Sequence, residues 1–204
     1  MRLGAYEEAC LQLAEALELG QQLGSASVQA RAHIDLARAQ DLQGRSDDAL
    51  SHTRQSLRLF RVAANRRGEA DALNAIGWCL AKVGAGTEAL QHCTQALAVF
   101  RELGNQAGEA VTLDTLGYIQ HQLGRPAEAI VRYEQAIDVH GDVDLGIRAE
   151  ILTHLGDARQ AVGQDTAAVQ AWQQALTILD DLNSPSAGQL REKLRLSPAP
   201  AAAR

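Results

Sequence analysis

The stretch Ala70–Glu109, ADALNAIGWCLAKVGAGTEALQHCTQALAVFRELGNQAGE, decides the fold, because weaker copies of it recur along the chain. The copies cover residues 30–69, 110–148 and 149–183. Small residues set their register. Glycines recur at spacings of 40, 40, 40 and 39, at Gly4, Gly44, Gly84, Gly124 and Gly163, and alanine follows each glycine five residues later. Self-similarity at a fixed period of this length predicts a repeat architecture.

Each copy predicts a helical hairpin. In the Ala70 copy, apolar residues fall on one helical stripe before Gly84 and again after it. The two helices are expected to be 16 to 18 residues, about 25 Å, long. A small residue lies seven positions before each of the last four turn glycines, at Ala37, Gly77, Gly117 and Gly156. Such residues let paired helices approach to about 8 Å.

These residues resemble the tetratricopeptide repeat (TPR), whose pattern has Leu-Gly on the first helix and spaced alanines on the second. The corresponding residues are Leu73, Ile76, Gly77, Leu80, Ala89, Cys93 and Ala96; Leu113, Leu116, Gly117, Ala129, Tyr133 and Ala136; and Leu152, Leu155, Gly156, Ala168, Trp172 and Ala175. The copy at Ala30 is the most divergent, with His33, Leu36, Ala37, Ala49, Thr53 and Ser56. The terminal proline of the family is absent, and the repeat is about 40 residues, as in the longer-helix TPRs of kinesin light chains.

The resemblance implies an all-α fold, an α–α superhelix (solenoid) of TPR hairpins. The expected TPR domain covers residues 1–195, with a lone second helix at 3–24, repeats at 30–69, 70–109, 110–148 and 149–183, and a capping helix at 186–196. Residues 197–204 are expected to form a disordered tail. The lone helix indicates either that the chain is cut from a longer protein or that a second subunit covers its edge in a homodimer.

Charge and composition argue against some classes of binding partner. A net charge of −6 and a pI near 5.5 argue against direct nucleic-acid binding by this segment. The arginines at 54, 58, 61, 66 and 67 form a solvated outer face or, less favoured, a patch for an anionic partner. No apolar run is long enough for a membrane span, so we expect no membrane partner and a cytoplasmic location. The three cysteines fit small core residues.

The sequence contains no catalytic or cofactor motif, so we expect no enzyme activity, no cofactor and no metal. One pair of histidines is a disfavoured candidate for metal binding or acid–base chemistry. His121 and His154 lie on first helices of neighbouring repeats and could approach each other, but nothing near them in the pattern would orient such a site.

The resemblance also implies that first helices line a concave groove that binds a protein or peptide ligand. The groove residues carried over are Arg31, Asp35, Arg38, Asp71, Asn74, Trp78, Lys82, Thr115, Tyr118, His121, His154 and Asp157. Trp78 and Tyr118 occupy the same position in adjacent copies. They are either ligand anchors, with a large rigid contact area, or residues that pack between repeats.

Residues 103–137 and 154–182 are similar to the C-terminal TPR regions of actinobacterial transcriptional regulators of the SARP and NTPase-coupled types. That similarity implies a non-catalytic sensor or interaction segment of a bacterial transcriptional regulator. The alternative is a self-assembling scaffold that uses the exposed edge of its N-terminal helix. A nucleic-acid-binding helical array is disfavoured by the acidic charge.

Overall fold

The computed structural model describes residues 2–141 and 144–196, with side chains from residue 11 onward except His140. The described residues form ten α-helices and no strands, which confirms the all-α prediction. The helices are α1 (Arg2–Gln22), α2 (Ala26–Leu42), α3 (Ser46–Val62), α4 (Arg66–Lys82), α5 (Gly86–Glu102), α6 (Gln106–Gln122), α7 (Pro126–His140), α8 (Leu145–Ala161), α9 (Asp165–Asp181) and α10 (Ala187–Leu196).

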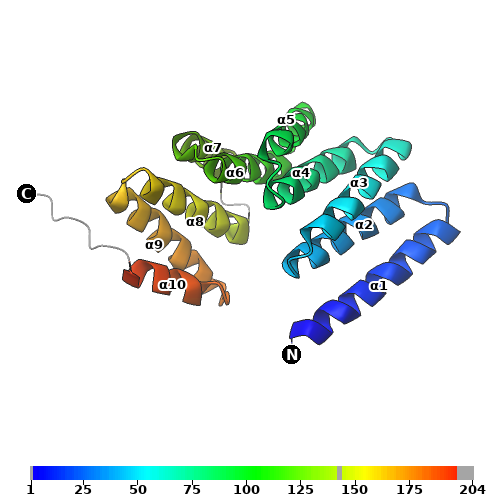
Figure 1. Ribbon diagram of the computed structural model, residues 1–204, viewed down its shortest axis with the longest axis horizontal. Coiled ribbons are helices and arrows are strands. Elements are labelled where there is room, and N and C mark those ends of the chain that lie inside the picture. Colours follow the sequence, from blue (N-terminus) through cyan, green and yellow to red (C-terminus); the bar gives the residue numbers. More distant parts are fainter. Residues whose placement is uncertain (1, 142–143, 197–204) are drawn as a thin grey trace, which may run out of the picture. The chain divides into compact units, whose positions relative to one another are not determined.

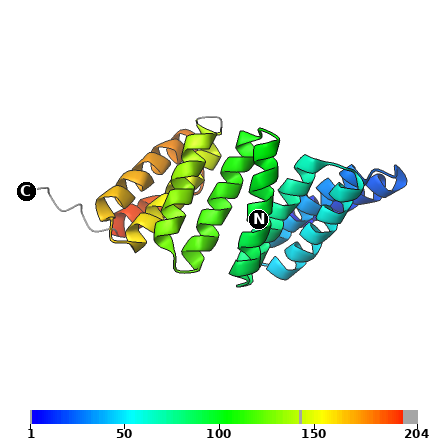
Figure 2. The same ribbon diagram turned by 90° about the horizontal axis from the view of Figure 1, so that it is seen from above.

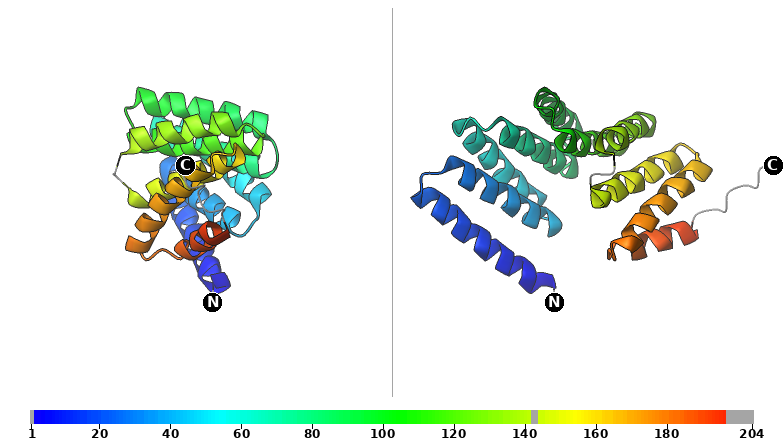
Figure 3. Two further views of the ribbon diagram at one scale, coloured as in Figure 1. Left: turned by 90° about the vertical axis from the view of Figure 1, so that its left-hand side faces the viewer. Right: turned by 180° about the vertical axis from the view of Figure 1, so that it is seen from behind.

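The chain divides into two compact units, residues 1–104 and 105–204. In the first, α2 pairs with α3 and α4 with α5, α3 packs on α4, and α1 packs on α2 (Figure 1). In the second, α6 pairs with α7 and α8 with α9, α7 packs on α8, and α10 packs on α9 (Figure 3). Figure 2 shows the members of each hairpin side by side. Most helices have 17 residues, within the range expected from the sequence.

First helices and second helices begin differently. Each first helix has a side-chain N-cap, and its oxygen accepts a hydrogen bond from a backbone N–H of the first turn; the caps are Ser25, Asn65, Asn105 and Asp144. The second helices α3, α5, α7 and α9 have no side-chain cap. The asparagine caps place the starts of α4 and α6 four residues before the repeats at 70 and 110. An N-cap of this kind contributes about 1 kcal/mol.

The turns explain the glycine register. Gly84, which ends α4, has a φ of +83°, a conformation that only glycine adopts without steric cost. The same register position is glycine in the other hairpin turns, at Gly44, Gly124 and Gly163, and all have positive φ. A second register lies between hairpins, where Gly24 and Gly104 share positive φ with Ala64 and Asn183. Ala64, at +50°, is the residue there least suited to its conformation.

The small residues inside the first helices are packing sites, as the sequence predicted. A β-carbon added to Gly77 would lie 2.1 Å from Cys93 Sγ, and one added to Gly117 would lie 2.6 Å from the Tyr133 ring. Cys93 and Tyr133 are fully buried. The reciprocal alanines of the second helices, Ala89, Ala129 and Ala168, are also completely buried. In three hairpins, a buried side chain of the second helix is therefore seated against a glycine of the first: Cys93 on Gly77, Tyr133 on Gly117 and Trp172 on Gly156.

The ends of the array carry single helices. α1 and α10 correspond to the lone helix and the capping helix expected from the sequence, with bounds that differ by one or two residues. The tail expected at residues 197–204 lies outside the described residues.

Candidate functional site

In the first unit, neighbouring first helices carry a chain of polar contacts. The Trp78 indole Nε1 donates a hydrogen bond to Asp41 Oδ2 at 2.8 Å, which links α4 to α2. Lys82 Nζ lies 5.1 Å from the centre of the Trp78 ring, within cation–π range. Arg31 of α2 forms an ion pair of 3.6 Å with Asp71 of α4. Trp78 is thus fixed by an acid on one side and covered by a cation on the other.

Asp71 is a partly buried acid of this α2–α4 face. Partial burial raises the pKa of its carboxyl group, although Arg31 and Arg67 act in the opposite direction. Asp35 and Asn74 are partly buried, while Arg38 and Lys82 are exposed. All seven groove residues expected in this unit therefore lie on α2 and α4, with at least part of their surface exposed.

The second unit has a corresponding α6–α8 face, built around His154 of α8. The Nδ1 atom of His154 lies 2.8 Å from Oδ1 of Asp114 on α6. The His154 ring centre lies 6.1 Å from that of Tyr118 and 5.8 Å from that of Tyr133. Burial alone would lower the pKa of His154, but Asp114, helped by Asp157 and Glu150, raises it above the ordinary value.

One groove expectation is corrected in this unit. Thr115 is buried, and its hydroxyl donates a hydrogen bond to the carbonyl of Val111 in its own helix, so it does not belong to the exposed face. His154, considered as a partner for His121, instead forms its hydrogen bond with Asp114. Asp114 was not among the groove residues expected from the sequence. Tyr118, His121 and Asp157 are partly buried, as surface-lining residues would be.

Asp157 connects the α6–α8 face to the C-terminal helix. Its Oδ1 atom accepts hydrogen bonds from Trp172 Nε1 at 2.9 Å and from Lys193 Nζ at 2.5 Å. Lys193 Nζ also lies 5.4 Å from the centre of the Trp172 ring. Both units therefore contain a tryptophan whose indole N–H donates to an aspartate while a lysine lies over the ring.

A histidine pair in the first unit was not anticipated. His33 Nδ1 and His52 Nδ1 lie 2.8 Å apart, close enough for one ring to donate a hydrogen bond to the other. Burial, followed by the neighbouring His52 and Arg58, lowers the pKa of His33; burial also lowers the pKa of His52. The sequence did contain a signal for this pair. The residues that correspond to His33 in the other copies are leucines, Leu73, Leu113 and Leu152, and a polar side chain at such a position needs a hydrogen-bond partner.

Each unit also contains a hollow lined by described residues. One, of about 350 Å³, lies in the second unit among α8, the end of α9 and α10. The other, of about 550 Å³, lies in the first unit and is lined by Arg54, Arg58 and His92 among others. Several of the clustered arginines pair with carboxylates: Arg54 with Glu88, Arg61 with Glu69, and Arg66 with Glu69 and Glu102. These pairs support the solvated-face interpretation of the cluster.

The surroundings of the two buried cysteines do not favour a reactive thiolate. Burial raises the pKa of the Cys79 thiol to about 11 and that of Cys93 to about 12, so both stay protonated at neutral pH. Among the described residues, no three metal-ligating side chains gather in one place. In the same part of the chain, no helix combines the length and apolar character that a membrane crossing requires.

The fold of the chain is similar to those of several solved structures. Solved structures with similar folds include BtubC from P. vanneervenii (20% identity, TM-score 0.67, covering 100% of this chain and 80% of that one). A Rap protein complexed with Competence and Sporulation Factor has 17% identity and a TM-score of 0.83, over 96% of this chain and 54% of that one. TPR-like repeats of a putative kinesin light chain from Podosopora anserina have 18% identity and a TM-score of 0.64, over 89% and 90%.

The chain thus spans about half the length of the Rap protein. No curated protein sequence matches it. Residues 63–140 match the family model described as tetratricopeptide repeat. With hairpins of the same architecture before and after that segment, the chain contains tetratricopeptide repeats and has the TPR-like helical-repeat fold.

Proposed function

We propose that the chain binds a protein or peptide partner through the exposed faces of its first helices, and that it has no catalytic activity of its own. The observation that carries this proposal is the arrangement around Trp78. Its indole is oriented by Asp41 and Lys82 on a helix face where the other first-helix residues are mostly small or charged. A rigid aromatic side chain beside charged groups suits recognition of a peptide.

The α6–α8 face supports the same proposal with different chemistry. Asp114, Tyr118 and His154 combine an acid, an aromatic ring and a titratable base within one partly exposed cluster. The cluster offers hydrogen-bond donors and acceptors suited to a polypeptide. It offers neither a nucleophile with an adjacent base nor a set of metal ligands, which is why we propose binding rather than catalysis.

Alanine substitutions test this proposal once a partner has been isolated. Trp78→Ala combined with Tyr118→Ala should weaken partner binding at least tenfold, because the two rings supply most of the aromatic contact area of these faces. Helicity measured by circular dichroism should be unchanged. Arg54→Ala, on the second helix α3, is the matched control and should bind normally. Unchanged affinity of the double variant would reject the two rings as anchors.

We further propose that the chain is the cytoplasmic sensor or interaction segment of a bacterial transcriptional regulator. The support is the sequence resemblance of residues 103–137 and 154–182 to such regulators, together with a fold like that of a Rap protein solved with Competence and Sporulation Factor. Such a segment would shift an equilibrium by binding a ligand more tightly in one state. An adjoining reading frame without a DNA-binding or nucleotide-binding domain would contradict this assignment.

Self-assembly is the second candidate, because α1 exposes residues whose counterparts are buried. Leu13 and Ala16 are partly exposed, whereas Cys93 and Ala96, at the same register positions of α5, are fully buried. Leu11 and Leu19 are exposed as well. Sedimentation across a wide concentration range tests this candidate. A monomer at every concentration would reject it, and a dimer that survives removal of residues 1–25 would reject the α1 edge as its interface.

A further inference from the structure

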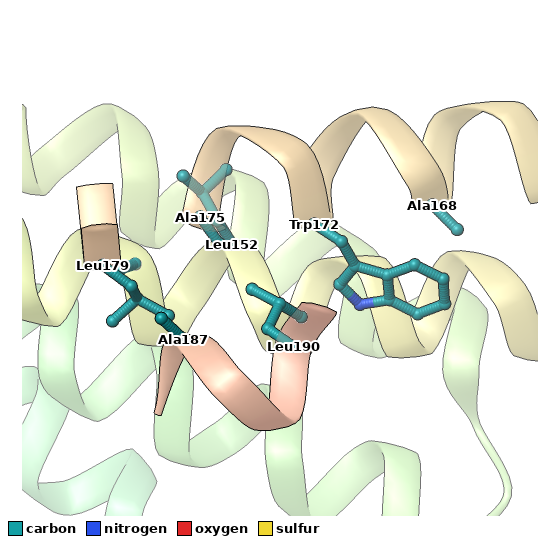
Figure 4. Packing of buried hydrophobic residues seen from close by; sticks show 8 residues of the cluster. Leu152, Ala168, Trp172, Ala175, Leu179, Ala187 and Leu190 are labelled. Carbon is teal, nitrogen blue, oxygen red and sulfur yellow. The ribbon is translucent and has the colours of Figure 1, made fainter. Parts of the chain in front are cut away.

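The terminal helix α10 covers the surface of α8 and α9 incompletely. Among the described residues of α10, only Ala187 and Leu190 are buried, whereas six residues of the first helix α8 are buried. Figure 4 shows Ala187 beside Leu179 and Leu190 beside the Trp172 indole. The apolar attachment of this helix therefore consists of Ala187 and Leu190, with the partly buried Leu194 packed against the same cluster.

α10 starts in the position of a further first helix but does not continue as one. Ala187 packs near Leu179 at the same register positions where Gly68 of α4 lies against Phe60. Two residues later, each first helix has a completely buried alanine: Ala30, Ala70, Ala110 and Ala149. In α10 that position is Gln189, which is exposed. The helix buries Leu190 instead, so its face is rotated away from the register of the array.

The mismatch coincides with the hollow of about 350 Å³ among α8, the end of α9 and α10. Ala149, Leu179 and Leu190 give it an apolar lining, and Glu150, His154, Gln189 and Lys193 add polar groups. A cavity with apolar walls loses the contacts that a well-packed helix would make there. A helix with an apolar residue at the position of Gln189 would place more apolar surface against this lining.

Two ion pairs also join α10 to α8 and α9. Lys193 pairs with Asp157 and lies over Trp172, and Arg191 pairs with Asp180. The side chains of the first pair are 38% and 32% exposed, and those of the second 57% and 41%. Ion pairs with this much solvent access contribute little to stability and weaken with salt. The two acids nevertheless give this surface a negative charge that complements a basic helix.

We propose that the C-terminal docking face, formed by Ala149, Asp157, Trp172, Leu179 and Asp180, binds a basic amphipathic helix of a partner protein, with α10 as its built-in competitor. The partner helix carries a small residue where Ala187 lies, leucine where Leu190 lies and basic residues where Arg191 and Lys193 lie. This inference deepens the proposed binding function, on which it rests, by assigning one face and one ligand chemistry.

The experiment uses the full chain with α10 undocked by Leu190→Asp and Lys193→Asp. The probe is a fluorescein-labelled synthetic peptide of residues 184–196, SPSAGQLREKLRL, read by fluorescence anisotropy. The undocked chain should bind the probe at least tenfold more tightly than the unaltered chain, whose own helix competes at an effective concentration in the millimolar range. A probe with Gln189→Leu should bind about three- to tenfold more tightly than the original probe, because leucine places more apolar surface against the apolar lining of the hollow.

A charge exchange shows whether the probe occupies the proposed place. Adding Asp157→Lys to the undocked chain should abolish binding of the original probe and restore binding of a probe with Lys193→Glu. Circular dichroism establishes that each variant is folded. If the doubly substituted α10 destabilises the chain, Lys193→Ala alone serves as the milder undocked variant, with the same expected order of affinities.

Three results would overturn the proposal. The first is a folded undocked chain that does not bind the probe, and the second is binding that is indifferent to Asp157→Lys. The third is a concentration-dependent dimer of the unaltered chain that Lys193→Glu dissociates, which would assign the face to α10 of a second copy. Trp78→Ala distinguishes this proposal from the wider one, because it alters the α2–α4 face and should leave probe binding unchanged.

Discussion

Gly156 lies so close to the Trp172 indole that a β-carbon at position 156 would lie 2.3 Å from Nε1. Trp172 is completely buried and hydrogen-bonded to Asp157, so it cannot move aside without losing packing and a hydrogen bond. The contact joins the two helices of the last hairpin. It shows why the sequence keeps glycine in the middle of α8, where alanine would favour the helix by up to about 1 kcal/mol.

We therefore expect Gly156→Ala to destabilise the chain by about 1 to 3 kcal/mol, the usual cost of overpacking a core. Urea unfolding followed by circular dichroism and tryptophan fluorescence measures the change. Gly188→Ala is the matched control, because Gly188 is also helical and a β-carbon there would meet no atom within 4 Å. It should be neutral or stabilising. Equal effects of the two substitutions would contradict the packing explanation.

The same register predicts a compensating pair in the second complete hairpin. Gly77→Ala should destabilise the chain because its β-carbon would overlap Cys93 Sγ. Cys93→Ala alone leaves a cavity and should also destabilise. In the double variant the new methyl group enters the vacated space, so its free energy of unfolding should exceed that expected from adding the two losses. The coupling should be about 0.5 to 3 kcal/mol in a double-mutant cycle. Strict additivity would mean that the two positions do not share this contact.

Acid should destabilise the first unit through the His33–His52 pair. The folded protein lowers the pKa of both rings below the ordinary 6.5, so their contribution to stability is complete above 6.5 and is lost as the pH falls through the folded values. His33→Leu places in this row the residue found at 73, 113 and 152. It should reduce the loss of stability between pH 7.5 and 5. The comparison is made by urea unfolding at each pH, and an unchanged pH profile would remove the pair as the cause.

In the second unit, His154 should make stability fall as the pH rises, which is the opposite of the effect of the histidine pair in the first unit. Its folded pKa is raised above 6.5, so the stabilising Asp114–His154 interaction is fully present below 6.5 and is lost as the pH rises through the folded value. The ring titration, followed by NMR of the imidazole protons, should lie above 6.5 and fall in Asp114→Asn. A titration below 6.5 in the unaltered chain would show that desolvation exceeds the effect of the carboxylate.

Ala64 offers a stabilising substitution. It has a φ of +50° in the turn between α3 and α4, where Gly24 and Gly104 occupy the equivalent positions. Ala64→Gly should relieve strain of about 1 to 2 kcal/mol, partly offset by the greater freedom of glycine in the unfolded chain. A net gain of about 0.5 kcal/mol or more in urea unfolding is expected. Gly84→Ala, at a φ of +83°, should lose stability; a gain there would show that these turns do not enforce their backbone conformation.

The regular features of the fold were predictable because they repeat. A glycine every 40 residues and the apolar stripes identify the hairpins, and Gly77, Gly117 and Gly156 mark the nested crossings. The contacts that break the period were not predictable. Asp41 reaches Trp78 and Asp114 reaches His154 diagonally between helices, which depends on side-chain direction rather than register. Thr115 lay in the expected groove row, yet its side chain turns back to its own helix.

The most direct test of the binding proposal locates the partner on the chain. A photo-crosslinking amino acid is placed in turn at Asp35 and His121 on first helices, and at Gln91 and Gln135 on second helices, in cells that express the chain natively. We predict that a crosslinked protein or peptide is recovered from the first-helix positions and not from the second-helix ones. Crosslinks confined to Gln91 and Gln135 would contradict the proposal that the first helices carry the recognition surface.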